Sequence, residues 1–450
     1  MSSLTLEALP HRVIGAVTFL LLLALPVLIL LIPRGGSVPY HLLALVGIIA
    51  LLLRWPGAPR RLAGEERLAI LGFAAFTITV LLSVAETGAS REAVRDLDVL
   101  LRPLWAIPII YLFVRVRPPE GMLWFGLSLG AVVAGLNALY EVITAAEYVR
   151  AEGGTSAVTY GNTALAMGVM AAAGLPYFRR LGRAWMIVPA AALLLGLVGS
   201  FLAGSRGGWL AIPVLALLLL WHYWQPGYRR LAIASVLTVA TIVSLALLLP
   251  QTGVKNRIDQ AVTQVQLYGQ DPAVHGDTSV GLRLEMWRAA WSLFLERPLF
   301  GGGMGHSFNR FLREGVAEGK FHPATTGQTM PHNVVLDLLA LRGLVGFTGV
   351  IVLWWALGRV FLTAARDPEM EIRALGTAGL ALLLGYAVFG LTDSVMDYGP
   401  PLVFFCLYSA LIAHFIGRTR LARGALEAQR RRDEGVQAAG ASAHGGAASV

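Results

Sequence analysis

Long apolar runs separated by short polar segments fill most of this 450-residue sequence. A helix of about 20 residues crosses the hydrocarbon core of a bilayer. Twelve runs reach or approach that length: residues 13–32, 39–53, 68–85, 99–114, 122–143, 160–178, 184–203, 208–224, 231–249, 332–357, 374–391 and 401–416. Because 56% of the residues are hydrophobic and only 14% are charged, the sequence predicts an all-α, polytopic membrane protein of about 12 transmembrane helices, the second of them short.

One long polar stretch interrupts this pattern between the ninth and tenth runs. The chain is thus expected to comprise transmembrane helices 1–9 (residues 1–249), a large loop (250–331), transmembrane helices 10–12 (332–417) and a basic tail (418–450) that is briefly helical and then disordered. Arginines concentrate in the segments on one side of the predicted spans. The positive-inside rule then places both termini in the cytoplasm and the loop on the outer side, which in a bacterial inner membrane is the periplasm.

Arg206 lies in a tight turn between two predicted spans, in the sequence Gly204-Ser205-Arg206-Gly207-Gly208. A helix that begins there presents free N–H groups beside an arginine, and this combination suits a phosphate group. A turn of small residues whose one arginine extends to the membrane surface would explain the same sequence. Both interpretations remain open from the sequence.

The loop contains a predicted amphipathic helix at residues 280–297. The apolar residues that share one face, at spacings of three and four, are Leu284, Trp287, Trp291 and Leu295. Arg283 and Arg288 flank this face. Such a helix is expected to lie along the membrane surface, where its arginines reach either a lipid-linked phosphate or ordinary lipid headgroups.

His332 stands where the tenth predicted span meets the loop. Thr329 is placed to cap that helix and Pro331 suits its first turn, so the imidazole is expected at the membrane surface, with Asn333 beside it. Asp393 ends the eleventh span on the same side, where it could orient His332, hold an arginine or simply terminate its helix. Four side chains fall at this predicted face: Arg206, Arg283, His332 and Asp393.

Other charged residues fall within or near predicted spans, where charges are costly and are usually paired or functional: Arg102, Asp337 and Arg342. We expect no metal and no cofactor, because the histidines of the loop lack a short ligand spacing. The acidic pair Asp96-Leu97-Asp98 is the alternative cation site. Cys406, the single cysteine, lies in an apolar run and excludes a disulfide framework.

Taken together, the motifs resemble the O-antigen ligase and polymerase superfamily over residues 184–347. They are Gly204-Ser205-Arg206-Gly207-Gly208, Arg283 with Trp287 four residues on, Pro298-Leu299-Phe300-Gly301-Gly302-Gly303, His332-Asn333, and Leu341-Arg342-Gly343-Leu344-Val345-Gly346. The resemblance implies a GT-C-like membrane glycosyltransferase with a periplasmic active site. Ligases of this superfamily move O-antigen from undecaprenyl diphosphate to the lipid A core oligosaccharide, whereas polymerases join repeat units on the lipid carrier.

The chemistry of such a transfer matches the candidate residues. A diphosphate leaving group needs cations, for which Arg206, Arg283 and Arg288 are candidates, and the acceptor hydroxyl needs a general base, for which His332 is the candidate. Ser205, Asn333 and Asp393 are expected to support these side chains. The implied mechanism is metal-independent and inverting.

The expected partners are the lipid-linked O-antigen, the lipid A core oligosaccharide and membrane lipids, and no nucleic acid. A polymerase is the alternative within the superfamily. A multi-span transporter is the alternative outside it, since twelve spans with both ends inside also suit a transporter. The large outer loop and the clustering of charges at one membrane surface favour the transferase.

Overall fold

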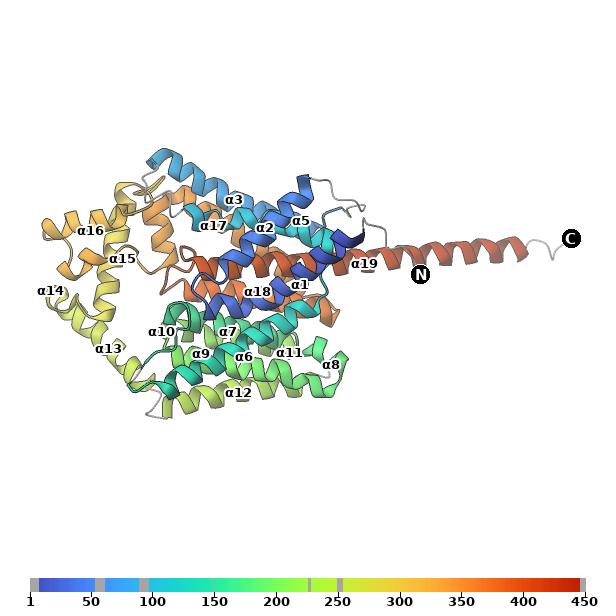
Figure 1. Ribbon diagram of the computed structural model, residues 1–450, viewed down its shortest axis with the longest axis horizontal. Coiled ribbons are helices and arrows are strands. Elements are labelled where there is room, and N and C mark those ends of the chain that lie inside the picture. Colours follow the sequence, from blue (N-terminus) through green and yellow to red (C-terminus); the bar gives the residue numbers. More distant parts are fainter. Residues whose placement is uncertain are drawn as a thin grey trace.

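The computed structural model describes residues 8–52, 61–88, 97–147, 149–225, 228–248 and 254–445, and within these ranges it contains helices and no strand (Figure 1). Nine helical segments of the described chain are long and apolar enough to cross a membrane. They are built from α1 (Ala8–Leu31), α3 (Gly64–Thr87), α5 (Arg102–Val116), α6 (Gly121–Thr144), α9 (Ile187–Ala203), α10 (Arg206–Trp209) with α11 (Ala211–Tyr223), α17 (Val334–Ala365), α18 (Met370–Phe389) and α19 (Gly399–Gly445). The protein is therefore an all-helical polytopic membrane protein, as the sequence predicted.

The three remaining predicted spans are also helical. They correspond to the shorter apolar helix α2 (Ser37–Leu52), to α7 (Ala157–Ala173) and to α12 (Arg229–Leu248). The sixth run was predicted to continue through residue 178, but α7 ends at Ala173, and α8 (Leu175–Leu181) follows it after Gly174. A Cβ on Gly174 would stand 2.3 Å from the Trp124 ring, so the chain bends where it packs directly on that ring. The predicted span ends at residues 53 and 249 and the loop start at 250–253 lie outside the described residues.

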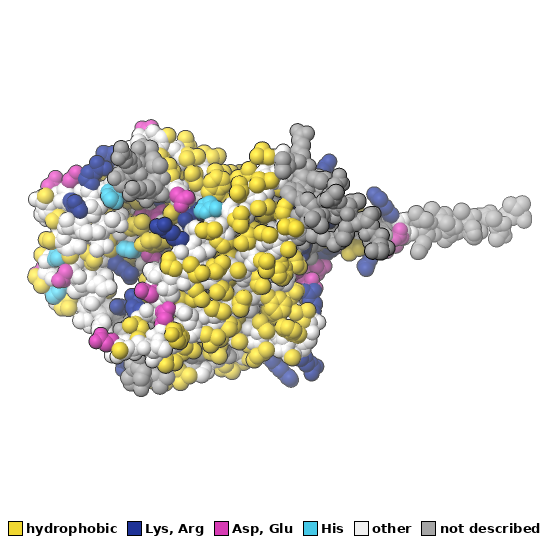
Figure 2. Space-filling view, viewed as in Figure 1, with side chains coloured by type: hydrophobic (Ala, Val, Ile, Leu, Met, Phe, Trp, Pro, Cys, Tyr) yellow, Lys and Arg dark blue, Asp and Glu magenta, His cyan; other side chains and the backbone are white. Residues whose placement is uncertain are grey.

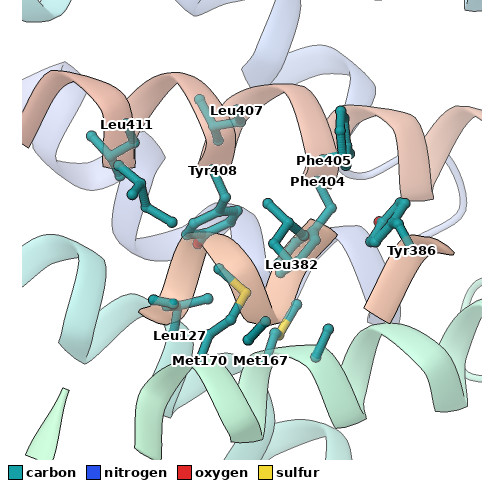
Figure 3. Packing of buried hydrophobic residues seen from close by; sticks show 14 of the residues in the cluster. Leu127, Met167, Met170, Leu382, Tyr386, Phe404, Phe405, Leu407, Tyr408 and Leu411 are labelled. Atoms are coloured by element: carbon teal, nitrogen blue, oxygen red, sulfur yellow. The ribbon is translucent and has the colours of Figure 1, made fainter. Parts of the chain in front are cut away.

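The core of the bundle is formed where α19 meets α18, α6 and α7. Figure 3 shows α19 side chains such as Phe404 and Tyr408 packed against Leu382 of α18, and Leu127 and Met167 of α6 and α7 close below them. Small residues bring α7 and α9 into close contact: a Cβ on Gly168 would lie 2.8 Å from a carbonyl oxygen of α9. Close backbone approach of this kind is how helices associate in lipid.

The large loop folds into helices at one end of the bundle. They are α13 (Val254–Gln270), α14 (Pro272–His275), α15 (Ser279–Glu296), α16 (Ser307–Ala317) and the 3₁₀ helix η3 (Pro323–Gly327). Helix α1 begins, and α19 extends outward, at the opposite end (Figure 1). Figure 2 shows hydrophobic side chains over the middle of the molecule and charged side chains gathered towards its two ends, as expected for a membrane-spanning bundle.

Helix α19 is longer than predicted. It continues to Gly445, whereas the end of the tail was expected to be disordered. Two contacts anchor its first polar part to the bundle. Arg420 lies 2.8 Å from Glu65 of α3, and Arg423 lies 3.1 Å from Asp367 after α17. Beyond them, Ala, Arg, Glu and Gln are strong helix formers, so composition favours continuing the helix.

Helix α17 is interrupted at Gly343, where φ is 61° and ψ is −164°. The segment 298–303 occupies the interruption and supplies the missing backbone partners. Four hydrogen bonds join the two: Leu344 N–H to the Pro298 carbonyl (2.8 Å), Val345 N–H to Leu299 (3.1 Å), Gly302 N–H to Ala340 (2.8 Å) and Gly303 N–H to Leu341 (3.1 Å). A helix can break in a membrane protein where other protein groups satisfy its backbone, and this segment does so.

The glycines of both motifs are required by this interlock. A Cβ on Gly301 would lie 2.4 Å from the backbone nitrogen of Arg342. A Cβ on Gly343 would lie 2.3 Å from the carbonyl oxygen of Leu299. Backbone therefore packs directly on backbone, which only glycine permits. The glycine-rich turn is thus explained by its contact with α17, and its Gly302 and Gly303 N–H groups are directed to that helix.

Candidate active site

Hydrogen bonds join the beginning of α17 to the turn that follows α18. The Val334 N–H donates to the Gly390 carbonyl (2.7 Å), and the Asn333 amide nitrogen donates to the Leu391 carbonyl (3.0 Å). The carboxamide oxygen of Asn333 accepts the free N–H groups of the first turn of α17, at 3.1 and 3.2 Å. Asn333 is therefore the helix cap and also joins the ends of two spans.

His332 precedes this cap and lies outside the helix. From the sequence, Thr329 was expected to cap this helix and Pro331 to lie in its first turn. Both residues instead lie before the helix, because the Asn333 side chain is the cap. His332 has a φ of 54°, in the left-handed region that residues with a side chain rarely adopt. Such conformations persist where the surroundings enforce them and are enriched at functional sites.

The ring of His332 contacts Asp393. Its Nδ1 lies 3.2 Å from Oδ1 of Asp393, which also accepts the Ser394 N–H at 3.0 Å. The Asp393 side chain is only 7% exposed, whereas that of His332 is 31% exposed. Facing a carboxylate, Nδ1 carries the proton in the neutral ring, so Nε2 has the free lone pair of a base. This is one of the roles that the sequence left open for Asp393.

Arg206 begins α10 beside the same turn. A Cβ on Gly207 would stand 1.8 Å from the hydroxyl oxygen of Thr392, so the first residues of α10 lie against the residue that precedes Asp393. Arg206 itself is half-buried. The structure thus places the start of α10 against the turn that carries Asp393, the residue that contacts His332.

Ser205 is buried and contacts α7. Its hydroxyl donates to the carboxamide oxygen of Asn162 in α7 at 2.9 Å. A Cβ on Gly208 would lie 2.1 Å from the same oxygen. Ser205 and Gly208 therefore hold the start of α10 against α7.

Arg283 lies on the face of α15 that meets the His332 loop. Trp287, four residues later, donates its indole N–H to the Pro331 carbonyl at 3.0 Å. Residues four apart share a helix face and are separated by about one turn, ~5.4 Å along the axis. Arg283 is half-buried and stands one turn before Trp287 on the same face of α15.

Arg288 is directed elsewhere. Its guanidinium lies 2.9 Å from the Glu285 carboxylate, donates to the Lys320 carbonyl and lies over the Phe321 ring at 5.6 Å. The structure does not bring it together with His332. Five residues separate it from Arg283, so the two arginines occupy different faces of α15.

Glu285 organises the loop around this arginine. Its buried carboxylate also accepts from the Tyr268 hydroxyl (2.5 Å) and the His322 N–H (3.0 Å). Burial and the hydrogen bond to Glu285 raise the pKa of Tyr268 to about 12, so its phenol stays a donor at neutral pH. The network joins α13, α15 and the segment after α16 into one unit.

The amphipathic helix α15 forms as predicted. It packs on α16 and α17 through side chains other than those of the predicted apolar face, namely Met286, Ala289, Ala290 and Leu293. On the predicted face, Trp291 is 48% exposed and Leu295 is 61% exposed. These two large side chains lie outside the protein core, and their contact with the membrane surface stays a prediction.

The turn that carries Asp393 also forms an ionic contact with Arg342 of α17. Arg342, the last residue before the break in α17, pairs with Asp397 of the same turn, and both side chains are almost fully buried. Burial by itself raises the pKa of Asp397, but the Arg342 guanidinium and hydrogen bonds from Asp337 and Arg342 together hold it below its usual range. Asp397 was not among the residues predicted from the sequence, because it lies in a turn without periodicity. The charges of Asp337 and Arg342 in a span were the signal that a partner exists.

Tyr398 links the two ionic contacts. Burial raises the pKa of its hydroxyl, and the neighbouring carboxylates of Asp393, Asp337 and Asp397 raise it further. The phenol therefore remains neutral. The turn between α18 and α19 supplies two of these carboxylates, Asp393 facing His332 and Asp397 facing Arg342, and α17 supplies Asp337.

The alternative cation site lies partly outside the described residues. Asp96 lies outside the described residues, and the Asp98 carboxylate lies 3.5 Å from the Arg102 guanidinium. Across the ranges that the structure describes, no three His, Cys, Asp or Glu side chains are grouped as metal ligands would be. The buried charge of Arg102 thus has a carboxylate partner at the membrane edge.

Comparison with known proteins gives two results. Residues 190–351 match the family model described as O-antigen ligase. An uncharacterized protein of Haemophilus influenzae is 23% identical over 391 residues, which cover 86% of this chain and 95% of that protein. The family match spans α10, α15, the interlocked glycine segments and His332. It confirms the resemblance predicted from the motifs: residues 190–351 match an O-antigen ligase family domain.

Proposed function

We propose that the protein transfers O-antigen from undecaprenyl diphosphate to the lipid A core oligosaccharide at the periplasmic face of the bacterial inner membrane. The contact between His332 and Asp393 carries this proposal, because it presents an oriented base where several spans end. The family match supports the class of reaction. The partly exposed ring is accessible to a hydroxyl group from the loop side.

In the proposed reaction, Nε2 of His332 accepts the proton of the acceptor hydroxyl. The hydroxyl oxygen forms a bond to the anomeric carbon of the donor as the bond from that carbon to the diphosphate oxygen breaks. Asp393 stabilises the resulting imidazolium. Attack opposite the leaving group inverts the anomeric centre, and a positioned base of this kind contributes roughly 10²–10⁴-fold to the rate.

The leaving diphosphate carries away the electron pair and needs positive charge. We assign this role to Arg206, at the start of α10, and to Arg283, on the face of α15 next to the His332 loop. Guanidinium groups match phosphate oxygens in a fork geometry, so the proposed mechanism places no metal ion in the reaction. Arg288 is assigned to the Glu285 network, where it supports the loop.

Transfer can be tested with purified protein and an undecaprenyl diphosphate-linked glycan in the presence of chelator. Lipid A core is offered as one acceptor and a second donor molecule as the other. Glycan on the lipid A core is the expected result. Longer chains that stay on undecaprenyl diphosphate would make the protein a polymerase, and transfer to neither acceptor would favour the transporter alternative.

A further inference from the structure

A cavity outside the proposed catalytic residues lies between the end of α3 and helix α16. Its volume is about 690 Å³, within the range of about 300–1,000 Å³ that ligand pockets occupy. Residues of both elements line it, among them Thr87, Gly303, His306, Arg310 and Arg313. We call this cavity the basic trough.

The basic trough leads towards the catalytic loop. A smaller cavity of about 160 Å³ shares Met304 and His306 with it. That cavity extends to Thr329 and Met330, two and three residues before His332. A ligand in the trough would therefore have one end beside the loop that carries the base.

The trough is shaped by glycine and held by a fixed helix. Gly303 lines the trough, and a Cβ on it would lie 3.1 Å from Thr87 on the opposite side. The absence of a side chain at this position therefore leaves space between the two residues. On α16, Phe308 and Leu312 are buried against the α15 cluster. Helix α16 is thus anchored by one face, and its other face turns Arg310 and Arg313 outward.

The charge of the trough selects its ligand. Arg310 and Arg313 lie one turn apart, and His306 lies a further turn before Arg310. Glu314 is the one acidic side chain among the residues that line the larger cavity. Two guanidinium groups on one helix face favour a ligand that carries phosphate or carboxylate groups.

We propose that the basic trough binds the acceptor as an anionic oligosaccharide, with its phosphate or carboxylate groups on Arg310 and Arg313 and its reacting hydroxyl towards His332. This inference rests on the proposed function for the identity of the acceptor. The donor also carries phosphate, but its diphosphate is assigned to Arg206 and Arg283, on α10 and α15. Binding experiments can separate the two sources.

The test measures binding of deacylated core oligosaccharide that retains its phosphates to the purified full-length protein by calorimetry. The double variant Arg310→Gln/Arg313→Gln is expected to bind at least tenfold more weakly. Arg310→Lys/Arg313→Lys retains the charge and should keep most of the affinity, which also controls for folding. Arg297→Gln removes an exposed arginine of the same loop that lines neither cavity and should bind as the unaltered protein does.

Two further arms distinguish the phosphate sources. Phosphatase treatment of the oligosaccharide should reduce the difference between the unaltered protein and the double glutamine variant, and any difference that remains would come from its carboxylate groups. Binding of undecaprenyl diphosphate should be the same in both proteins. Equal oligosaccharide binding in the two proteins, or a loss confined to the undecaprenyl diphosphate, would overturn the inference. The binding measurement does not require turnover. A failure of transfer would therefore count against the proposed function, while the binding result would still test the role of Arg310 and Arg313.

Discussion

At the scale of single residues, the site depends on how a few polar groups are divided between orientation and chemistry. The Asn333 amide nitrogen donates to the Leu391 carbonyl at 3.0 Å, and the Ser205 hydroxyl donates to the Asn162 side-chain oxygen at 2.9 Å. Both contacts join separate helices near the site. Asp393 holds the ring of His332. These partners leave Nε2 of His332 as the group available to a substrate.

Asp393→Asn tests the orienting carboxylate. The asparagine oxygen can still accept the Ser394 N–H, so the turn should fold, but the negative charge that stabilises the imidazolium is lost. The transfer rate should fall, by less than the roughly 10²–10⁴-fold expected for loss of the base. Combining this change with His332→Ala should cause no further loss. Additive losses would show that Asp393 acts independently of His332.

The arginines give a second residue-scale prediction, with Arg288 as the matched control. Arg206→Gln and Arg283→Gln should each raise the KM for the lipid-linked donor by roughly tenfold or more, as expected for a lost charge-assisted hydrogen bond. Arg288→Gln should leave that KM unchanged and instead lower the thermal stability of the loop, because Glu285 then loses its ionic partner. Donor KM values unchanged in both Arg206→Gln and Arg283→Gln would remove their assignment to the diphosphate.

At the scale of elements, the interlock between segment 298–303 and the break in α17 explains two glycine motifs at once. It also places Arg342 beside Asp397 and brings Met304 to the wall of both cavities. The loop is thereby joined to a transmembrane helix by backbone hydrogen bonds. We expect this joint to be a major source of rigidity at the site.

Gly343→Ala and Gly319→Ala test the interlock as a matched pair. Both glycines have positive φ, but only a Cβ at Gly343 would meet neighbouring backbone, whereas one at Gly319 would meet nothing within 4 Å. Gly319→Ala should cost about 1–2 kcal/mol for the left-handed conformation alone. Gly343→Ala should cost roughly a further 1–3 kcal/mol for the clash. Equal shifts of the apparent Tm in detergent would contradict the interlock.

Much of this element structure followed from local patterns, and the remainder did not. The apolar runs predicted the spans because a bilayer imposes one length on every helix. Asn333 and Thr329 are both residue types that cap helices, and Asn333 is the cap because its side-chain oxygen accepts the N–H groups of Val335 and Leu336. The buried face of α15 and the position of Arg288 depend on α16, α17 and Glu285, which are partners chosen by tertiary packing. Asp397 and the pairing of the glycine motifs involve contacts between distant parts of the chain that no periodicity reveals.

At the scale of the whole molecule, the polar loop and the long end of α19 lie at opposite ends of the helical bundle (Figure 1). This arrangement agrees with the arginine distribution in placing the two on opposite sides of a membrane. A single buried cysteine, Cys406, leaves the surface open to labelling at introduced cysteines.

The orientation is tested by Gly327→Cys in the loop and Gly424→Cys in α19, two exposed positions where a Cβ meets nothing within 4 Å. A maleimide that cannot cross the inner membrane should label the loop cysteine in intact cells. It should label the α19 cysteine only after the inner membrane is permeabilised. The reverse pattern would place the site on the cytoplasmic face and exclude a periplasmic transfer.

The central claim is that His332 is the base for glycosyl transfer, and the most direct measurement is the single-turnover transfer rate of His332→Ala to lipid A core. His275→Ala, a change at a partly exposed histidine of α14, is the control. We predict that His332→Ala inserts in the membrane at normal abundance and loses about 10²–10⁴-fold in rate, while His275→Ala transfers normally. A His332→Ala protein that transfers at the rate of the unaltered protein would contradict the account.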